Sequence, residues 1–228
     1  MMQRRNMILG GFAVLGLGGW ALSSNMGGGS GSTELSNLAG AANAQTTSGD
    51  FDTSSITEMV LGNPDAAVTV VEYASFTCPH CAAFHSGAFK QLKADFIDTG
   101  KIKFVYREVY FDRPGLWASM IARCGGQERF FGIVDLIYKG QSNWARAGEP
   151  AAIVDELRKI ARLAGMDNDT IEACLQDAEK AQTLVAWFEE NKNRDDVTST
   201  PSFLINGNKH SNMAYSEMKE LIDAELGS

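Results

Sequence analysis

The sequence predicts an α/β fold in which a mixed β-sheet is flanked by helices and interrupted by an all-helical subdomain. An apolar run at residues 68–76 leads into a helical pattern, the pattern from about 116 to 191 is helical throughout, and strand patterns return at 200–213. Strands on both sides of a long helical block are what a sheet with a helical insertion requires. We therefore place one folded domain at residues 56–228, with the helical insertion at about 113–192.

The first residues have the layout of an export signal. Arg4 and Arg5 precede a run, residues 7–22, that is apolar apart from its glycines. Residues 1–23 are therefore predicted to be a signal peptide, and an uncleaved membrane anchor is the alternative that stays open. Residues 24–55 consist mainly of small and polar residues and predict a flexible linker, because they cannot bury enough apolar surface to form a core. We expect the protein in the periplasm, either free or tethered to the inner membrane.

The composition of the chain limits the classes of partner. The formal net charge of −8 argues against nucleic acid and against an anionic membrane surface. The sequence contains no glycine-rich loop of the kind that cradles phosphate groups, and we expect no cofactor. Four cysteines behind an export signal fit an oxidising compartment.

The first predicted strand contains one carboxylate. Residues 68–76 are otherwise apolar on both alternating sets, which is typical of a central strand that is covered on both faces. Glu72 in such a strand is costly unless it is protonated, paired or functional. Two interpretations stay open from the pattern. Glu72 either pairs with a lysine, or it is a buried proton acceptor for a nearby thiol, that of Cys81.

Cys78-Pro79-His80-Cys81 follows at the junction between this strand and the first helix. The unpaired N–H groups and the positive end of the helix macrodipole would stabilise a thiolate at Cys78. A lowered thiol pKa makes the matching disulfide a better oxidant. Pro79 suits the first helical turn, and a protonated His80 would add positive charge near Cys78. The context predicts redox chemistry at this pair.

Two other interpretations of the pair are a structural disulfide and half of a zinc site. A zinc site made of thiolates needs a second close cysteine pair, and the sequence has none. His85 lies on the apolar face of the predicted helix and is expected in the core. We therefore predict no metal site.

The next elements are a strand and the helical block. Residues 102–106 alternate after Gly100, which predicts a second strand parallel to the first. Pro150 and Asp167 are placed where they can begin helices.

Cys124 and Cys174 both fall inside the helical block. Two buried free thiols are one interpretation. We favour a structural disulfide, because an even number of cysteines in an exported protein favours pairing.

A hairpin is predicted near the end of the chain. Residues 200–205 have a strand pattern and are followed by Asn206-Gly207, a strong turn signal for a second, antiparallel strand. Pro201 lies at the start of the first of these strands, and on frequency alone the bond between Thr200 and Pro201 is expected to be trans.

Together, two motifs at opposite ends of the domain carry a resemblance. Cys78-Pro79-His80-Cys81 after the 70–76 strand, with Thr200-Pro201 far downstream, resembles the DsbA family of thioredoxin-fold oxidoreductases over residues 60–226. The resemblance implies a thioredoxin fold with a helical insertion. It implies that Cys78 is the exposed nucleophile, that Cys81 is its buried partner and that Glu72 is the buried acid. It also implies that Pro201 is cis and lies against the pair, that Thr200 contacts the pair, and that substrate pairs with this backbone.

The function that the resemblance implies is disulfide formation in exported proteins by dithiol–disulfide exchange through Cys78 and Cys81. Reduced, unfolded exported proteins would be the substrates, and a DsbB-like membrane partner that passes electrons to quinone would reoxidise the pair. We expect a monomer, because the short polar segment 24–55 does not resemble the dimerisation domain of dedicated isomerases. The alternatives are a disulfide reductase or isomerase, a thiol donor dedicated to one client, and a metal carrier that uses Cys78, Cys81 and His80.

Overall fold

The computed structural model describes residues 51–227, all of them in one compact unit of the chain. The predicted signal or anchor, residues 1–23, and most of the predicted linker lie outside the described residues. The last residues of that linker are part of the fold. Asp52 caps a short 3-10 turn, Thr53–Ser55 (η2), and Thr53 Oγ1 donates a hydrogen bond of 2.8 Å to Glu190. The folded part therefore begins a few residues earlier than the composition indicates.

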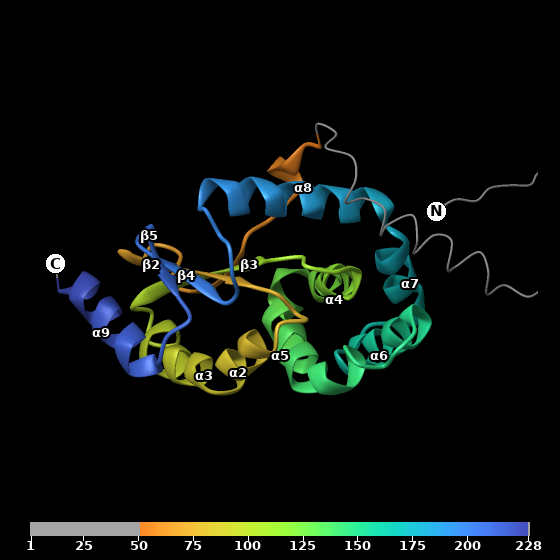
Figure 1. Cartoon of the computed structure of the whole chain (residues 1–228), viewed down its shortest axis with the longest axis horizontal. Helices are drawn as coiled ribbons and strands as arrows, with labels where there is room; N and C mark the ends of the chain where they lie inside the picture. Colours follow the sequence, from red (N-terminus) through yellow and green to blue (C-terminus); the bar gives the residue numbers. More distant parts are fainter. Residues whose placement is uncertain (1–50, 228) are drawn as a thin grey trace, which may run out of the picture. The chain divides into compact units, whose positions relative to one another are not determined.

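Five strands form one mixed sheet in the order β1-β3-β2-β4-β5 (Figure 1). The central strand β2 pairs in parallel with β3 and antiparallel with β4, and β4 and β5 form the predicted hairpin. The mixed sheet is therefore confirmed. One edge strand, β1, was not predicted, because four residues are too few to show an alternating pattern. The strands are β1 (Met59–Gly62), β2 (Val68–Ala74), β3 (Ile102–Glu108), β4 (Ser202–Ile205) and β5 (Asn208–Ser211).

Helices cover both faces of this sheet (Figure 1). The helix that follows the cysteine pair is broken at Gly87 and continues into a π-helical turn. The last helix packs on α3 and on β2. These elements are α2 (Pro79–Ser86), α3 (Ala88–Leu92), η3 (Lys93–Ile97) and α9 (Tyr215–Leu226).

The predicted helical insertion is confirmed between β3 and β4. Pro150 is the first residue of its third helix, and Asp167 caps the fourth by accepting a hydrogen bond of 2.9 Å from the Thr170 N–H, as predicted. Figure 1 shows the last of these helices on the opposite side of the sheet from α2 and α3. The five helices are α4 (Arg113–Cys124), α5 (Gly126–Trp144), α6 (Pro150–Leu163), α7 (Asn168–Gln176) and α8 (Ala178–Arg194).

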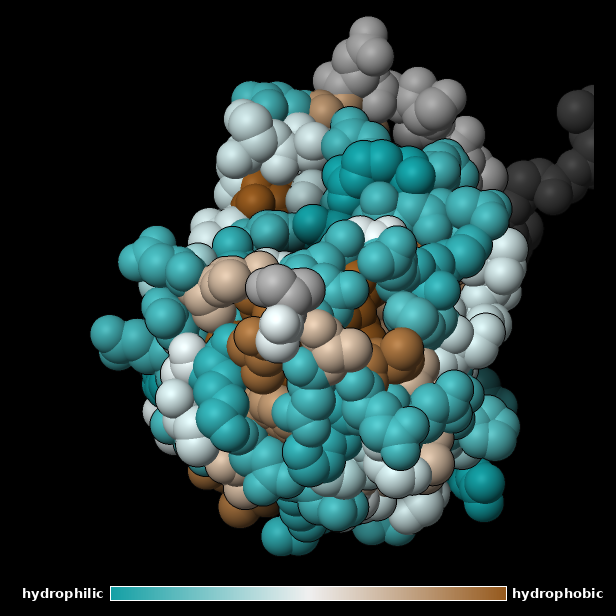
Figure 2. All heavy atoms as spheres, turned by 90° about the vertical axis from the view of Figure 1, so that its left-hand side faces the viewer, coloured by the Kyte–Doolittle hydropathy of each residue, from teal (hydrophilic) through white to brown (hydrophobic). Residues whose placement is uncertain are grey.

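A continuous hydrophobic core joins the sheet to the insertion. Tyr106 on β3 meets Phe130 on α5 with their rings 5.7 Å apart. The face of the molecule on the left of Figure 1 is mainly hydrophilic, with hydrophobic side chains gathered near its centre (Figure 2). None of the helices in residues 51–227 combines the length and the apolar character that crossing a membrane requires.

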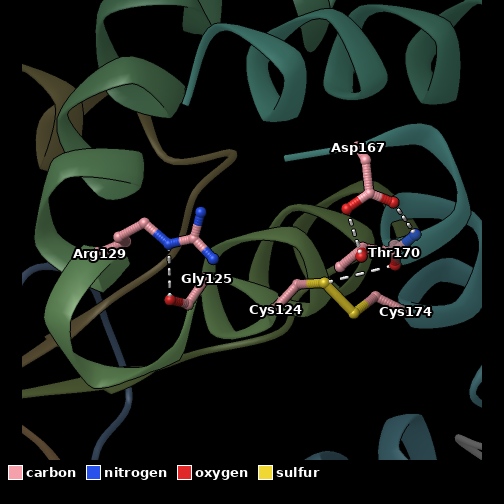
Figure 3. The surroundings of a disulfide bond; sticks show 6 residues. All are labelled: Cys124, Gly125, Arg129, Asp167, Thr170 and Cys174. Atoms are coloured by element: carbon pink, nitrogen blue, oxygen red, sulfur yellow. Dashed lines mark hydrogen bonds between the residues drawn. A yellow bond between two sulfur atoms is a disulfide. The ribbon is translucent and has the colours of Figure 1, made fainter. Parts of the chain in front are cut away.

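A disulfide joins Cys124 at the end of α4 to Cys174 on α7, as predicted (Figure 3). The two Cα atoms are 6.0 Å apart, within the usual range for a disulfide. Figure 3 shows the Asp167 cap of α7 beside this bond. The bridge therefore ties two helices of the insertion to each other, away from the Cys78 and Cys81 motif.

A buried ion pair ties the insertion to the sheet. Arg123 on α4 donates to both carboxylate oxygens of Glu108 at the end of β3, from Nε at 2.6 Å and from Nη2 at 2.7 Å. The side chains of Arg123 and Glu108 are 5% and 0% exposed. Ser119 also donates to Glu108, at 2.9 Å. The carboxylate is thus fully paired in the interior, where an unpaired charge is costly.

Candidate active site

The two cysteines of the motif lie at the start of α2. Cys78 is the residue before the helix, Pro79 is its first residue, and the Cys78 N–H donates to the Ser75 carbonyl at 3.1 Å. Both sulfurs are free thiols. Cys78 is half-buried, whereas Cys81 has no exposed surface. The pair therefore combines a sulfur that a second molecule can reach with one that it cannot.

Hydrogen bonds from its surroundings lower the pKa of Cys78 to about 5. The largest contribution is the hydrogen bond from the Cys81 thiol, which burial opposes; the nearby Thr200 side chain and the backbone N–H groups of Cys81 and His80 lower the pKa further. The helix start therefore acts as predicted. The backbone N–H of His80 contributes to this stabilisation, and its side chain is exposed.

The ionisation of Cys78 gives a direct test of this environment. Titrating the thiolate of the reduced protein by ultraviolet absorbance should show one thiolate with a midpoint near pH 5, because burial raises the pKa of Cys81 far above this range. The thiolate stabilises the reduced fold, and this stability should be lost as pH falls through about 5, since the folded pKa lies below that of a free thiol. Cys78→Ser should remove the absorbance change near pH 5. A midpoint near the free-thiol value of about 8.5 would contradict the described environment.

The loop before β4 lies against the pair. The Thr200–Pro201 peptide bond is cis, as the resemblance implies and against the expectation from frequency. The carbonyl oxygen of Thr200 is 3.5 Å from Cys78 Sγ. The structure therefore brings together Cys78, Thr200 and Pro201, which are more than a hundred residues apart in the sequence.

Glu72 is fully buried on β2 and pairs with a histidine. Its Oε2 atom is 2.9 Å from Nε2 of His85, which is 5% exposed. The alternative of a lysine partner is therefore wrong, and His85 is a partner of the acid as well as a core residue. The charge of Glu72 adds to burial in raising the pKa of Cys81. His85 follows Cys81 by four residues and so shares its helix face, which was the one sequence signal for this contact.

Two side chains of α5 hold the loop that carries Cys78. The side-chain amide of Gln141 donates to the carbonyl oxygens of Phe76 at 2.8 Å and Cys78 at 2.9 Å. The hydroxyl of Tyr138 donates to the Ser75 carbonyl at 3.3 Å. The contacts of Gln141 are not predictable from the sequence, because a glutamine in a helical pattern is usually a solvated surface residue.

The chain is similar to known proteins over most of its described length. The profile of the thioredoxin family matches residues 54–224. The chain is 36% identical over 170 residues to a Rickettsia bellii protein named "Putative protein-disulfide oxidoreductase", and this match covers 74% of the chain and 64% of the relative. It is 29% identical to disulfide bond formation protein D of Bacillus subtilis, over 73% of the chain and 76% of the relative.

Among solved structures, alpha-DsbA1 of Wolbachia pipientis is similar in fold, with a TM-score of 0.69 and 26% identity. That similarity covers 82% of this chain and 96% of the Wolbachia chain. In contrast, this chain matches only 60% to 64% of the length of the Rickettsia relatives. The rest of each Rickettsia protein lies outside the match.

Proposed function

Because the chain belongs to the thioredoxin family as a DsbA-like member, we propose that it is a thiol:disulfide oxidoreductase that introduces disulfide bonds into exported proteins. The observation that carries the proposal is the asymmetry of the cysteine pair. Cys78 is accessible and has a pKa of about 5, whereas Cys81 is buried and its pKa is raised. A thiol that is stable as a thiolate is a good leaving group, which favours transfer of the disulfide to a substrate.

The proposed reaction starts from the disulfide between Cys78 and Cys81. A substrate thiolate attacks the Cys78 sulfur and forms a mixed disulfide, and the electron pair of the broken bond goes to the Cys81 sulfur, which takes up a proton. A second thiolate of the substrate attacks the substrate sulfur of the mixed disulfide and releases Cys78 as a thiolate. The substrate is then oxidised by two electrons and the pair is reduced by two.

The surroundings of the pair support this order of events. The cis-Pro201 loop lies beside Cys78 and offers backbone groups next to the reacting sulfur. Glu72 is the carboxyl group that influences Cys81, so we assign it the proton that the Cys81 sulfur takes up. His80 is exposed, and residues 51–227 contain no cluster of three potential metal ligands, so they provide no support for the metal-carrier alternative.

The direction of the reaction is tested by the reduction potential of the Cys78–Cys81 pair. Equilibration with glutathione should give a value well above that of thioredoxin, about −270 mV, and the oxidised protein should form disulfides in a reduced, unfolded substrate. Cys78→Ser cannot form the pair, so it should show no such reduction potential and should form no disulfides in the substrate. A potential at or below the thioredoxin value would instead support the reductase alternative.

We further propose that the protein works in the periplasm on reduced, unfolded exported proteins, as a monomer, and that a quinone-linked membrane partner reoxidises it. The export-like N-terminus and the resemblance support this setting. Trapping thiols in intact cells should find Cys78 and Cys81 oxidised at steady state. A pair that is mostly reduced would support a reductase or isomerase that is kept reduced by a membrane donor.

The role of Glu72 is tested by Glu72→Gln. We expect exchange to be about 10- to 100-fold slower, because the amide cannot carry the proton. The free energy of unfolding should be unchanged or higher, because the amide keeps the shape of the acid and a contact with His85 and cannot ionise in the interior. Stopped-flow exchange with a model peptide and denaturant melts measure the two quantities. A less stable variant with an unchanged rate would show that Glu72 is only a structural acid.

A further inference from the structure

Glu72 has no direct way to exchange protons with water. Its side chain is 0% exposed, and among the contacts of residues 51–227 its Oε1 atom has no hydrogen-bond partner while its Oε2 atom contacts only His85. A carboxyl group that serves Cys81 must regain or release its proton in every cycle. The residue that contacts it is therefore the natural route for that proton.

His85 also lines a cavity. The cavity has a volume of about 210 Å³, and two of the residues that line it, His85 and Tyr138, are buried. Its rim is charged and exposed, with side chains from α2, α3 and α5. His85 keeps 5% of its surface exposed, whereas Glu72 and Cys81 have no exposed surface. The rim residues are Ser86, Lys90, Asp135 and Lys139.

The imidazole is held in place by aromatic rings. It stacks on Tyr138 at 4.4 Å and on Phe89 at 4.5 Å between ring centroids, and it makes a T-shaped contact with Tyr106 at 5.8 Å. Histidine accepts a proton at one ring nitrogen and releases one from the other, so it can pass a proton on while the ring stays where it is. The titratable groups that face it are Glu72 from β2, Tyr106 from β3, Lys90 from α3, and Asp135, Tyr138 and Lys139 from α5.

From this geometry we propose that His85 is a positioning and proton-transfer residue that connects Glu72 to solvent through the cavity. The inference rests on the proposed function. When the bond between Cys78 and Cys81 breaks, Glu72 gives its proton to the Cys81 sulfur. His85 then gives a proton to the Glu72 carboxylate, and water at the cavity rim restores the proton on His85. One proton enters from solvent and one new S–H bond forms.

The test is a double-mutant cycle on the rate of exchange with a reduced dithiol peptide. His85→Gln keeps a hydrogen-bonding side chain next to Glu72 but cannot relay a proton, and we expect exchange to be about tenfold slower. If His85 acts through Glu72, then the variant with both Glu72→Gln and His85→Gln will be no slower than Glu72→Gln alone. The Cys78 titration midpoint should stay near pH 5 in all variants, because His85 is not among the groups that set it.

Chemical rescue gives a second readout that a purely structural role would not produce. His85→Ala enlarges the cavity, and added imidazole should restore a large part of the lost rate. His210→Gln is the matched control, because His210 lies on β5, away from the cavity, and it should exchange at the rate of the unsubstituted protein.

Two outcomes overturn the inference while the unsubstituted protein still oxidises the peptide. One is an unchanged rate in His85→Gln. The other combines two results. The double variant is slower than Glu72→Gln by the same factor by which His85→Gln is slower than the unsubstituted protein, and imidazole does not restore the rate of His85→Ala. An unsubstituted protein that does not oxidise the peptide at all would instead refute the proposed function.

Discussion

Replacing Arg123 with methionine is expected to lower the free energy of unfolding by about 3 to 5 kcal/mol. The substitution keeps an unbranched side chain against Phe130 and Trp187 but removes both hydrogen bonds to Glu108. The Glu108 side chain is 0% exposed, so its charge would stay in the interior without its cation. Denaturant unfolding of the oxidised protein measures the loss.

Two controls separate the buried charge from lost packing. Adding Glu108→Gln to Arg123→Met should recover much of the stability, because an interior without a charge tolerates an apolar neighbour. Arg158→Met removes two more exposed pairs, those of Arg158 with Glu172 and with Asp155, and should cost about 1 kcal/mol or less. Equal losses for Arg123→Met and Arg158→Met would contradict the argument.

Removing the bridge between Cys124 and Cys174 by replacing both with alanine is expected to cost about 4 kcal/mol, because the bridge closes a loop of 50 residues and so restricts the unfolded chain. The exchange rate should stay within about twofold, since the bridge lies in the insertion and contributes no group to the Cys78 site. Thermal or denaturant melts and the peptide assay measure the two effects.

A matched variant isolates the bridge. In Cys78→Ala/Cys81→Ala the bridge is the only disulfide that can form, so adding dithiothreitol should lower its stability by the same amount. Mass spectrometry of the exported protein should find Cys124 and Cys174 joined. Two free thiols in that protein, or a loss below about 1 kcal/mol, would contradict the prediction.

The sequence predicts those features that repeat along the chain and fails where a contact depends on packing. The apolar pattern around Glu72 predicts its burial, because alternation in a strand reports which faces are covered. Nothing in that pattern identifies the partner of Glu72, because the contact with His85 forms only when β2 and α2 pack against each other. The edge strand β1 and the break at Gly87 are too local to change a periodic pattern.

The geometry around Cys78 shows the same limit. The sequence places Cys78 at a helix start, and the backbone N–H groups that stabilise its thiolate follow from that position alone. Only the resemblance predicted the cis bond at Pro201, because the frequency of X-Pro bonds favours trans. Gln141 could not be found, because its two acceptors are more than sixty residues away in the sequence.

The contacts of α5 mean that the redox motif is not a transferable module. Three carbonyl groups of the segment leading into α2, those of Ser75, Phe76 and Cys78, accept hydrogen bonds from Tyr138 and Gln141, one turn apart on α5. A minimal protein made by cutting out the insertion would keep the sheet, the cysteines and the cis-proline. It would remove the hydrogen bonds from α5, so that the Ser75 and Cys78 carbonyls would keep only their backbone donors, the Cys78 and Ala82 N–H groups, and the cysteine segment would lose its support from the insertion. Miniaturising this protein or grafting its motif therefore requires α5 to be carried along or its donors to be rebuilt.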